Sequence, residues 1–495
     1  MNGLYILLIL AAYFALLLLV ARLTSTRPDN DAFFRGNRRS PWPLVAFGMI
    51  GASLSGVTFV SVPGMVKSID MTYLQTCMGF FAGYLVIAHV LLPLYYRLRL
   101  TSIYTYLGNR LGRQAYRTGA SFFLLSKLLG ASLRLYLVCL ILQEFIFDAY
   151  GIPFAVTATT IVGLIWLYTH RCGIRTIVWT DTLQTFFLLL TLVLIVVAVA
   201  STLRLDARGL WDAVTTDTHS RVFVFDDWIS KQNFFKQFFS GVFITIVMTG
   251  LDQDMMQKNL TCRNLKEARK NMYCYGFSFL PVNFLFLSLG ILLLLAANRL
   301  GLPVPERGDD LLPMFAAGGY LGYGVLTCFT IGILAAAFSS ADSALTALTT
   351  SVCIDLLDVE KKTKEEAERR RRQVHVLLSV LFVGCILGFK FIDSPSVIDT
   401  LYTMTSYTYG PLLGLFAFGL FTRRTPRGPY VPVVAVASPV ICYITARVVS
   451  LHTDYSFGYE LLMLNGLLTF AGLALISIHA KKQTALWTSR TQNSK

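Results

Sequence analysis

The chain has 495 residues, of which 55% are hydrophobic and only 14% are charged. Soluble domains usually carry roughly 25% charged residues, so this composition excludes an ordinary soluble enzyme. The net charge of +15 would suggest a nucleic-acid partner if it lay on one soluble face, but the basic residues are spread over short segments between apolar runs. We therefore expect no nucleic-acid binding.

Apolar runs follow one another along the whole chain. The first begins at residue 4 and lacks a small-residue cleavage site, which predicts a retained membrane span and not a removed leader. Reading the runs against polar breaks predicts about thirteen spans, and the segment GGYLGYG interrupts the ninth. The predicted ranges are 4–22, 42–65, 72–97, 117–147, 153–169, 175–201, 234–257, 271–297, 313–356, 373–391, 397–422, 429–449 and 458–480.

Basic residues indicate the direction of insertion. With an outside N-terminus, the predicted inside loops hold 31 of the 43 Lys and Arg residues and the outside loops hold 10. Because cationic loops are seldom translocated, this pattern predicts an outside N-terminus and a cytoplasmic C-terminus. The basic segment 361–372 has two interpretations, a lipid-headgroup site or a solvated loop helix, and we favour the second.

The spans between residues 42 and 422 divide into two groups of five. Five is odd, so the groups 42–201 and 234–422 must insert with opposite orientation. The opening span of each group contains glycines, in GMIGASLSGVTFVSVPG and FFSGVFITIVMTGLDQD. Glycine can serve close helix packing alone, but two such spans at corresponding positions, with Pro63 closing the first, favour unwound helices at a midplane binding site.

Hydroxyl side chains and an acid are concentrated in the segment LAAAFSSADSALTALTT, residues 334–350. Ser339 and Ser343 are four residues apart and share a helical face, with Ser340 at its edge. Converging hydroxyls can replace the water shell of a small hard cation. A small-residue packing face explains the alanines but not Asp342, because a carboxylate within a membrane is expensive and indicates function.

Two further charged residues lie within predicted spans. Asp181, with Gln184 beside it, lies about two turns into its span and could be a helix-start residue, although the serine helix makes a cation ligand more attractive. Arg134 lies about halfway along its span. It is expected either to pair with an acid such as Asp181 or with freed carbonyls, or to present a planar fork to a substrate carboxylate.

Five stretches in order resemble the sodium/solute symporter family, which includes the sodium-coupled sugar, proline, iodide, monocarboxylate and sialic acid carriers. They are FFRGNRRSPW, SLSGVTFVSVPG, LLPLYYRLRLTSIYTYLGNRLG, IVWTDTLQ and AAAFSSADSAL, and the resemblance covers about residues 30–425. It implies an all-α polytopic membrane protein with the leucine-transporter-like 5+5 inverted repeat. This fold agrees with the two groups of five spans.

The resemblance also implies ligands for sodium ions. One ion would bind the backbone carbonyls of Gly51, Leu54 and Ala336 and the hydroxyls of Ser339 and Ser340. A second site, present in some members, would use Asp181, Ser339 and Ser343, with Asp342 as a further candidate. The nine cysteines show no C-x-x-C pair, so we expect no structural metal site and no disulfide framework.

Substrate contacts implied by the resemblance come from four helices of the two repeats and from the last helix of the second. The candidate positions are Ser53, Ser55, Thr58, Gln75, Cys77, Arg134, Thr245, Met248, Tyr402 and Ser406. The sugar carriers have an acid and an amide where this chain has Val57 and Thr58, which disfavours a plain hexose. Related carriers of carboxylated solutes use an arginine on the helix of Arg134.

These features together predict a sodium-coupled symporter in a bacterial inner membrane that imports a carboxylated solute such as a sialic acid, a sugar acid or a monocarboxylate. The alternatives are a neutral sugar or polyol as solute, or a solute sensor built on a transporter body. We expect residues 1–30 to form an extra N-terminal span, and 423–495 to form two extra spans and a short cytoplasmic tail. We expect a monomer in the lipid bilayer, with no enzymatic activity.

Overall fold

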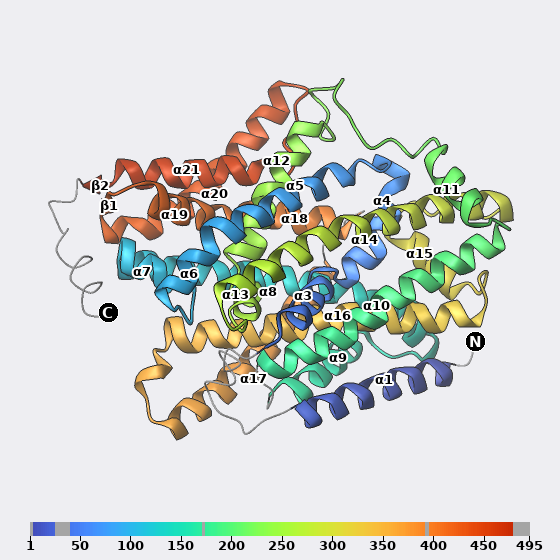
Figure 1. Cartoon of the computed structure of the whole chain (residues 1–495), viewed down its shortest axis with the longest axis horizontal. Coiled ribbons are helices and arrows are strands. Elements are labelled where there is room, and N and C mark those ends of the chain that lie inside the picture. Colours follow the sequence, from blue (N-terminus) through green and yellow to red (C-terminus); the bar gives the residue numbers. More distant parts are fainter. Residues whose placement is uncertain (1–2, 25–39, 171–173, 392–395, 479–495) are drawn as a thin grey trace.

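The computed structural model describes residues 3–24, 40–170, 174–391 and 396–478 as long helices that run beside one another (Figure 1). In these ranges seven helices are long and apolar enough to cross a membrane, or up to nine if each of two bent pairs is one span. The chain is therefore an integral membrane protein. Most of the FFRGNRRSPW motif and the predicted cytoplasmic tail lie outside the described residues.

The helices follow the predicted order. A first helix, α1 (Gly3–Thr24), precedes the region of the first repeat, which contains α3 (Trp42–Ser53), α4 (Gly56–Ile69), α5 (Tyr73–Val86), α6 (Leu92–Leu98), α7 (Thr105–Leu111), α8 (Arg113–Leu142), α9 (Phe154–Thr169) and α10 (Ile174–Thr202). After α11 (Ala207–Thr215), the second repeat region contains α12 (Phe234–Thr245), α13 (Gln253–Asn259), α14 (Leu265–Leu300), α15 (Leu311–Ala317), α16 (Tyr323–Ser351), α17 (Lys364–Phe389), α18 (Val397–Thr408) and α19 (Gly410–Phe421). The last helices are α20 (Val431–His452) and α21 (Leu461–Leu475), and two short strands, β1 (Thr425–Pro426) and β2 (Ser477–Ile478), pair after α19 and α21.

Both glycine-containing opening spans are broken, as predicted. Helices α3 and α4 meet at an angle of 59°, and the segment Phe234–Gly250 meets α13 at 69°. The first break falls at Leu54 and Ser55, while Pro63 lies inside α4, so the proline does not close the unwound segment. A π-helical turn, η5 (Ile246–Gly250), joins α12 to the second break. Each break lies in the interior of the helix bundle, where freed carbonyls and amides can face polar groups instead of lipid.

Two other breaks shape the second repeat. The predicted range 397–422 is divided at Tyr409, because Pro411 in the first turn of α19 has no amide hydrogen to continue the ladder of α18. The interruption predicted at GGYLGYG is confirmed, since Gly319 and Gly322 take φ angles of +76° and +85° between α15 and α16. These angles suit glycine and separate the two helices.

Helices α5 and α12, one from each repeat region, touch through their backbones. A methyl group on Gly79 would collide with the carbonyl oxygen of Phe238, and one on Gly241 would collide with that of Thr76. Close approach through small residues is the usual way in which helices pack inside a bilayer. The two halves of the protein are therefore joined at this contact with no side chain between them.

Replacing Gly241 by Ala should lower the free energy of unfolding by about 1–3 kcal/mol, because the added methyl group has only rigid backbone to displace. The matched control is Gly163→Ala in α9, where nothing lies within 4 Å of the new methyl group. Thermal unfolding of both purified variants in detergent measures the difference. Equal melting temperatures for the two variants would contradict the tight contact.

Candidate functional site

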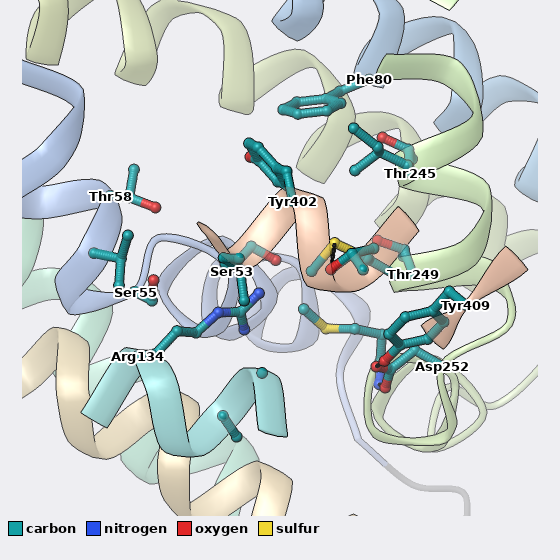
Figure 2. Close-up of a pocket in the computed structure, with 18 of the residues that line it drawn as sticks. Ser53, Ser55, Thr58, Phe80, Arg134, Thr245, Thr249, Asp252, Tyr402 and Tyr409 are labelled. Atoms are coloured by element: carbon teal, nitrogen blue, oxygen red, sulfur yellow. Dashed lines mark hydrogen bonds between the residues drawn. The ribbon is translucent and has the colours of Figure 1, made fainter. Parts of the chain in front are cut away.

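A pocket in the middle of the bundle collects side chains from both broken helices. It is lined by the α3–α4 break, by α5, α8 and α14, by the α12–α13 segment and by α18 (Figure 2). Seven of the ten predicted substrate residues line it, namely Ser53, Ser55, Thr58, Arg134, Thr245, Met248 and Tyr402. The sequence thus indicated most of the pocket wall, from residues on the α3–α4 break, on α8, on the α12–α13 segment and on α18.

The α3–α4 break faces the serine helix α16. A helix ends with carbonyl groups that lack an intrahelical partner, and the last turn of α3 ends at Ser53. Ser340 Oγ donates a hydrogen bond of 3.2 Å to the carbonyl of Ala52, within this last turn. Ser339 Oγ is buried with no hydrogen-bond partner among the described residues. The structure therefore brings the carbonyl end of α3 and the predicted hydroxyls of α16 to one buried place.

The other predicted ligands of this place lie on the same elements. Gly51 and Leu54 belong to the end of α3, and Ala336 is fully buried one turn before Ser340 on α16. Helix α16 packs against both α3 and α4. Carbonyl and hydroxyl oxygens are the ligands that a hard monovalent cation uses in place of water, and the residues present suit that role.

Asp181 lies on α10 against the same part of α16. Its Oδ2 atom accepts a hydrogen bond of 3.4 Å from Ser343 Oγ, and its Oδ1 atom is buried and has no hydrogen-bond partner in the part of the chain that the structure describes. Gly48 of α3 presses on it, because a Cβ atom there would lie 3.1 Å from the Cβ atom of Asp181. Asp181 is fully buried and lies seven residues after Ile174, the first residue of α10, so it is not in the first turn of the helix. It is a buried carboxylate beside the predicted serine face.

Asp342 takes a different direction from the serine face. Its carboxylate accepts a hydrogen bond of 2.8 Å from the hydroxyl of Tyr168 on α9, and it is fully buried. The tyrosine hydroxyl supplies part of the hydrogen bonding that a buried carboxylate requires. The structure thus places Asp342 between α16 and α9, joined to a helix of the outer layer.

Lys258 is the direct partner of Asp181, although the predicted spans left it in the loop between residues 257 and 271. Lys258, on α13, is fully buried, and its Nζ atom lies 2.8 Å from Asp181 Oδ2 and 3.7 Å from Asp254 Oδ1. Sequence reasoning missed this pair. The available signal was the run DQDMMQKN directly after the second break, which places Asp254 and Lys258 four residues apart on one helical face.

A second buried lysine continues the chain of charges toward the pocket. Lys127 of α8 lies 2.8 Å from Asp254 Oδ2 and 3.1 Å from Asp252 Oδ2. Tyr409 also donates a hydrogen bond of 2.8 Å to Asp252 Oδ2, as Figure 2 shows at the edge of the pocket. Because Asp252 caps α13 and the helix carries Asp254 and Lys258, three lysine–carboxylate pairs fix it in place, two to Lys127 of α8 and one to Asp181 of α10.

Arg134 projects from α8 into the pocket toward Ser53 (Figure 2). Its Nε atom is buried and has no hydrogen-bond partner within the described ranges. The structural partner considered for it, Asp181, is paired instead with Lys258. Arg134 is therefore a guanidinium that faces the cavity, seven residues along the helix from a lysine whose charge is already compensated.

Three predicted substrate residues lie outside the pocket wall. Gln75 accepts from the backbone N–H of Val224 and donates to the carbonyl of Gln232, so it holds the segment that precedes α12. Cys77 is buried in the apolar core, and Ser406 donates to the carbonyl of Tyr402 within its own helix. Sequence position on the correct helix does not fix which face a side chain takes.

Tyr402, which lines the pocket, is held by two other tyrosines. The hydroxyls of Tyr73 on α5 and Tyr402 on α18 are hydrogen bonded at 2.8 Å. The Tyr402 ring also stacks edge-on against that of Tyr459, with ring centres 5.0 Å apart. The Tyr73–Tyr402 hydrogen bond joins α5 to α18 beside the cavity that Tyr402 lines.

The fold and the site together define a membrane transporter with the leucine-transporter-like inverted repeat. A solved structure of a Na⁺-coupled sialic acid symporter in a substrate-bound, outward-open state is similar, with a TM-score of 0.82 at 21% identity, covering 95% of this chain and 97% of that one. A nucleobase-cation-symport-1 family transporter in a closed conformation is similar with a TM-score of 0.56 at 13% identity, covering 91% and 94%. The predicted all-α fold with an inverted repeat is confirmed, while the count of about thirteen spans stays a prediction.

Sequence comparison supplies the family. The model of the sodium:solute symporter family matches residues 33–428, so the chain belongs to that family and the resemblance stated above is confirmed. The sodium/sialic acid symporter SiaT of Proteus mirabilis is 24% identical over 89% of this chain and 88% of its own length. The sodium/sialic acid symporter NanT of Aliivibrio fischeri is 24% identical over 84% of this chain and 82% of its own length.

The lysine–carboxylate chain generates a prediction about stability. Lys127→Met should leave the buried Asp252 without a cation, and Asp254 with only the more distant Lys258, and should lower the free energy of unfolding by about 3–5 kcal/mol. The control is Arg221→Met, which breaks an exposed pair with Asp226 and should cost less than about 1 kcal/mol. The melting temperatures of the two purified variants, each measured against the parent protein, show the difference in stability. A stable Lys127→Met protein would show that the buried pair does not hold α13.

Proposed function

We propose that this protein is a sodium-coupled symporter that imports a small carboxylated solute, with a sialic acid as the first candidate. The observation that carries the proposal is the Arg134 guanidinium, which faces the pocket while the neighbouring acids Asp252 and Asp254 are paired with Lys127. A partly buried charge without a partner is costly, and a carboxylate that binds it in a planar fork removes that cost. The sodium/sialic acid symporters among its relatives support the same solute class.

The coupling ion is bound where the α3–α4 break meets α16. Sodium is held by the carbonyls of Gly51, Leu54 and Ala336 and by the hydroxyls of Ser339 and Ser340. The Ser340 hydrogen bond to the Ala52 carbonyl and the unpartnered Ser339 hydroxyl support this assignment. Because Ser53 and Ser55 of the same break line the solute pocket, an ion bound at the break orders part of the solute site. Ion and solute binding are then coupled through one segment of backbone.

The protein lies in a bacterial inner membrane with its N-terminus outside and its C-terminus in the cytoplasm. The excess of basic residues in one set of loops supports this orientation. The segments 42–201 and 234–422 are the two inverted repeats, 1–30 is an extra N-terminal span, and 423–495 holds two extra spans and a short cytoplasmic tail. The protein acts as a monomer that carries its solute without chemical change, and the symporter family supports the transport role.

A neutral sugar or polyol is the second candidate solute. Ser53, Ser55, Thr58 and Thr245 supply hydroxyls to the pocket, which would suit a polyhydroxylated compound with or without a carboxylate. The candidates differ in their need for Arg134. A sensor built on the same body would bind the solute without moving it, and counterflow of radiolabelled solute in liposomes separates binding from transport.

Arg134→Lys should weaken sialic acid binding by at least about tenfold although it keeps the charge, because an ammonium cannot form the bidentate fork. Calorimetric titration of the purified protein with sialic acid in saturating sodium measures the effect, and melting temperature checks the fold. The control is Arg299→Lys, whose side chain donates to the carbonyl of Leu203. A lower melting temperature of Arg134→Lys with unchanged sialic acid affinity would show that Arg134 has a structural role and does not bind the solute.

Ser339→Ala and Ser340→Ala should each raise the half-saturating sodium concentration for uptake by about tenfold or more, since each removes an oxygen ligand but little volume. Ser379→Ala is the control, because that hydroxyl donates only within its own helix, to the His375 carbonyl. Initial uptake rates of labelled sialic acid across a sodium series give the comparison. Unchanged sodium dependence in both α16 variants would place the ion elsewhere.

A further inference from the structure

The Asp181 carboxylate has a cation of its own. Lys258 Nζ lies 2.8 Å from Asp181 Oδ2, and both side chains are fully buried. The same carboxylate oxygen accepts a hydrogen bond of 3.4 Å from Ser343 Oγ, one of the oxygen donors expected for a second sodium site. The other expected donor, Ser339 Oγ, is buried one helical turn before Ser343 and has no hydrogen-bond partner among the described residues. The chain therefore supplies a fixed positive charge at the place where the family resemblance implies a second ion.

A sodium ion and the lysine ammonium would compete for this place. A sodium ion bound to Asp181 would lie about 4 Å from the ammonium group. At an effective dielectric constant of about 20, two like charges at that distance repel strongly enough to weaken binding by about 1,000-fold. Lys258 cannot easily withdraw, because it is on a short helix that is fixed on its other side through Asp254 and Lys127.

We propose that the Lys258 ammonium acts as the resident cation of the Asp181 position, so that this chain binds one sodium ion, at the α3–α4 break, and none at Asp181. Lys258 is then a specificity-determining residue that sets the number of coupling ions. The proposal rests on the sodium coupling proposed above. It predicts that neutralising Lys258 opens a second sodium site made by Asp181, Ser339 and Ser343.

The test counts sodium ions on the purified full-length protein with radioactive sodium and no solute. The parent should bind one ion per chain, and Lys258→Gln should bind two. Lys258→Arg keeps the charge and should bind one, as should the exposed control Lys266→Gln. In Lys258→Gln, the further change Ser340→Ala should leave the second ion in place and weaken the first.

Two ions on the parent protein, or one on a well-folded Lys258→Gln protein, would overturn the role of Lys258. If Lys258→Gln does not fold, Asp181→Asn decides, because one ion on both this variant and the parent supports the proposal and a fall from two to one overturns it. A parent that binds no sodium would instead refute the proposed sodium coupling. Failure of the Lys258 proposal and failure of the proposed sodium coupling therefore give different numbers of bound sodium ions.

Discussion

A backbone carbonyl in the middle of a membrane must find a partner inside the protein, and the whole site depends on this constraint. Helix α3 ends at Ser53 inside the bundle, and its last carbonyl groups accept no hydrogen bond from amide groups of the same helix. The hydroxyl of Ser340 on α16 donates a hydrogen bond to one of these carbonyl groups, that of Ala52. The serine helix, the break and the pocket are therefore one arrangement, in which oxygen atoms freed by the break are available to a cation at the border of the solute cavity.

At the second broken helix, charged side chains bind the backbone groups that the break at α13 leaves free. Asp252 caps α13 by accepting from the backbone N–H groups of Asp254 and Met255, and it also pairs with Lys127. Lys258, one turn after Asp254, reaches Asp181 on α10. The two breaks thus differ in chemistry, since the first exposes neutral oxygens and the second is held by ion pairs. A mobile ion suits the first, and fixed charges suit the second.

Most of the architecture could be predicted from the sequence because apolar length, glycine pairs and basic loops each report a bilayer requirement directly. The pocket residues on the broken helices, such as Ser53 and Thr245, followed from the family resemblance and not from these signals. The partners of buried charges could not be predicted, because Asp181 and Lys258 are distant in the chain and only packing brings them together. Helix position alone also failed for Gln75 and Ser406, whose side chains turn to the backbone.

The backbone contact between α5 and α12 has a consequence for the range of solutes. Phe80 and Tyr84 of α5 and Ile244 and Thr245 of α12 line the cavity on adjoining surfaces. Gly79 and Gly241 leave no compressible side chain between these two helices, so α5 and α12 form one closely packed wall of the cavity. Related chains that accept larger or smaller molecules would therefore be expected to differ in the cavity residues of α8 and α18, where the size of the side chains sets the width of the cavity.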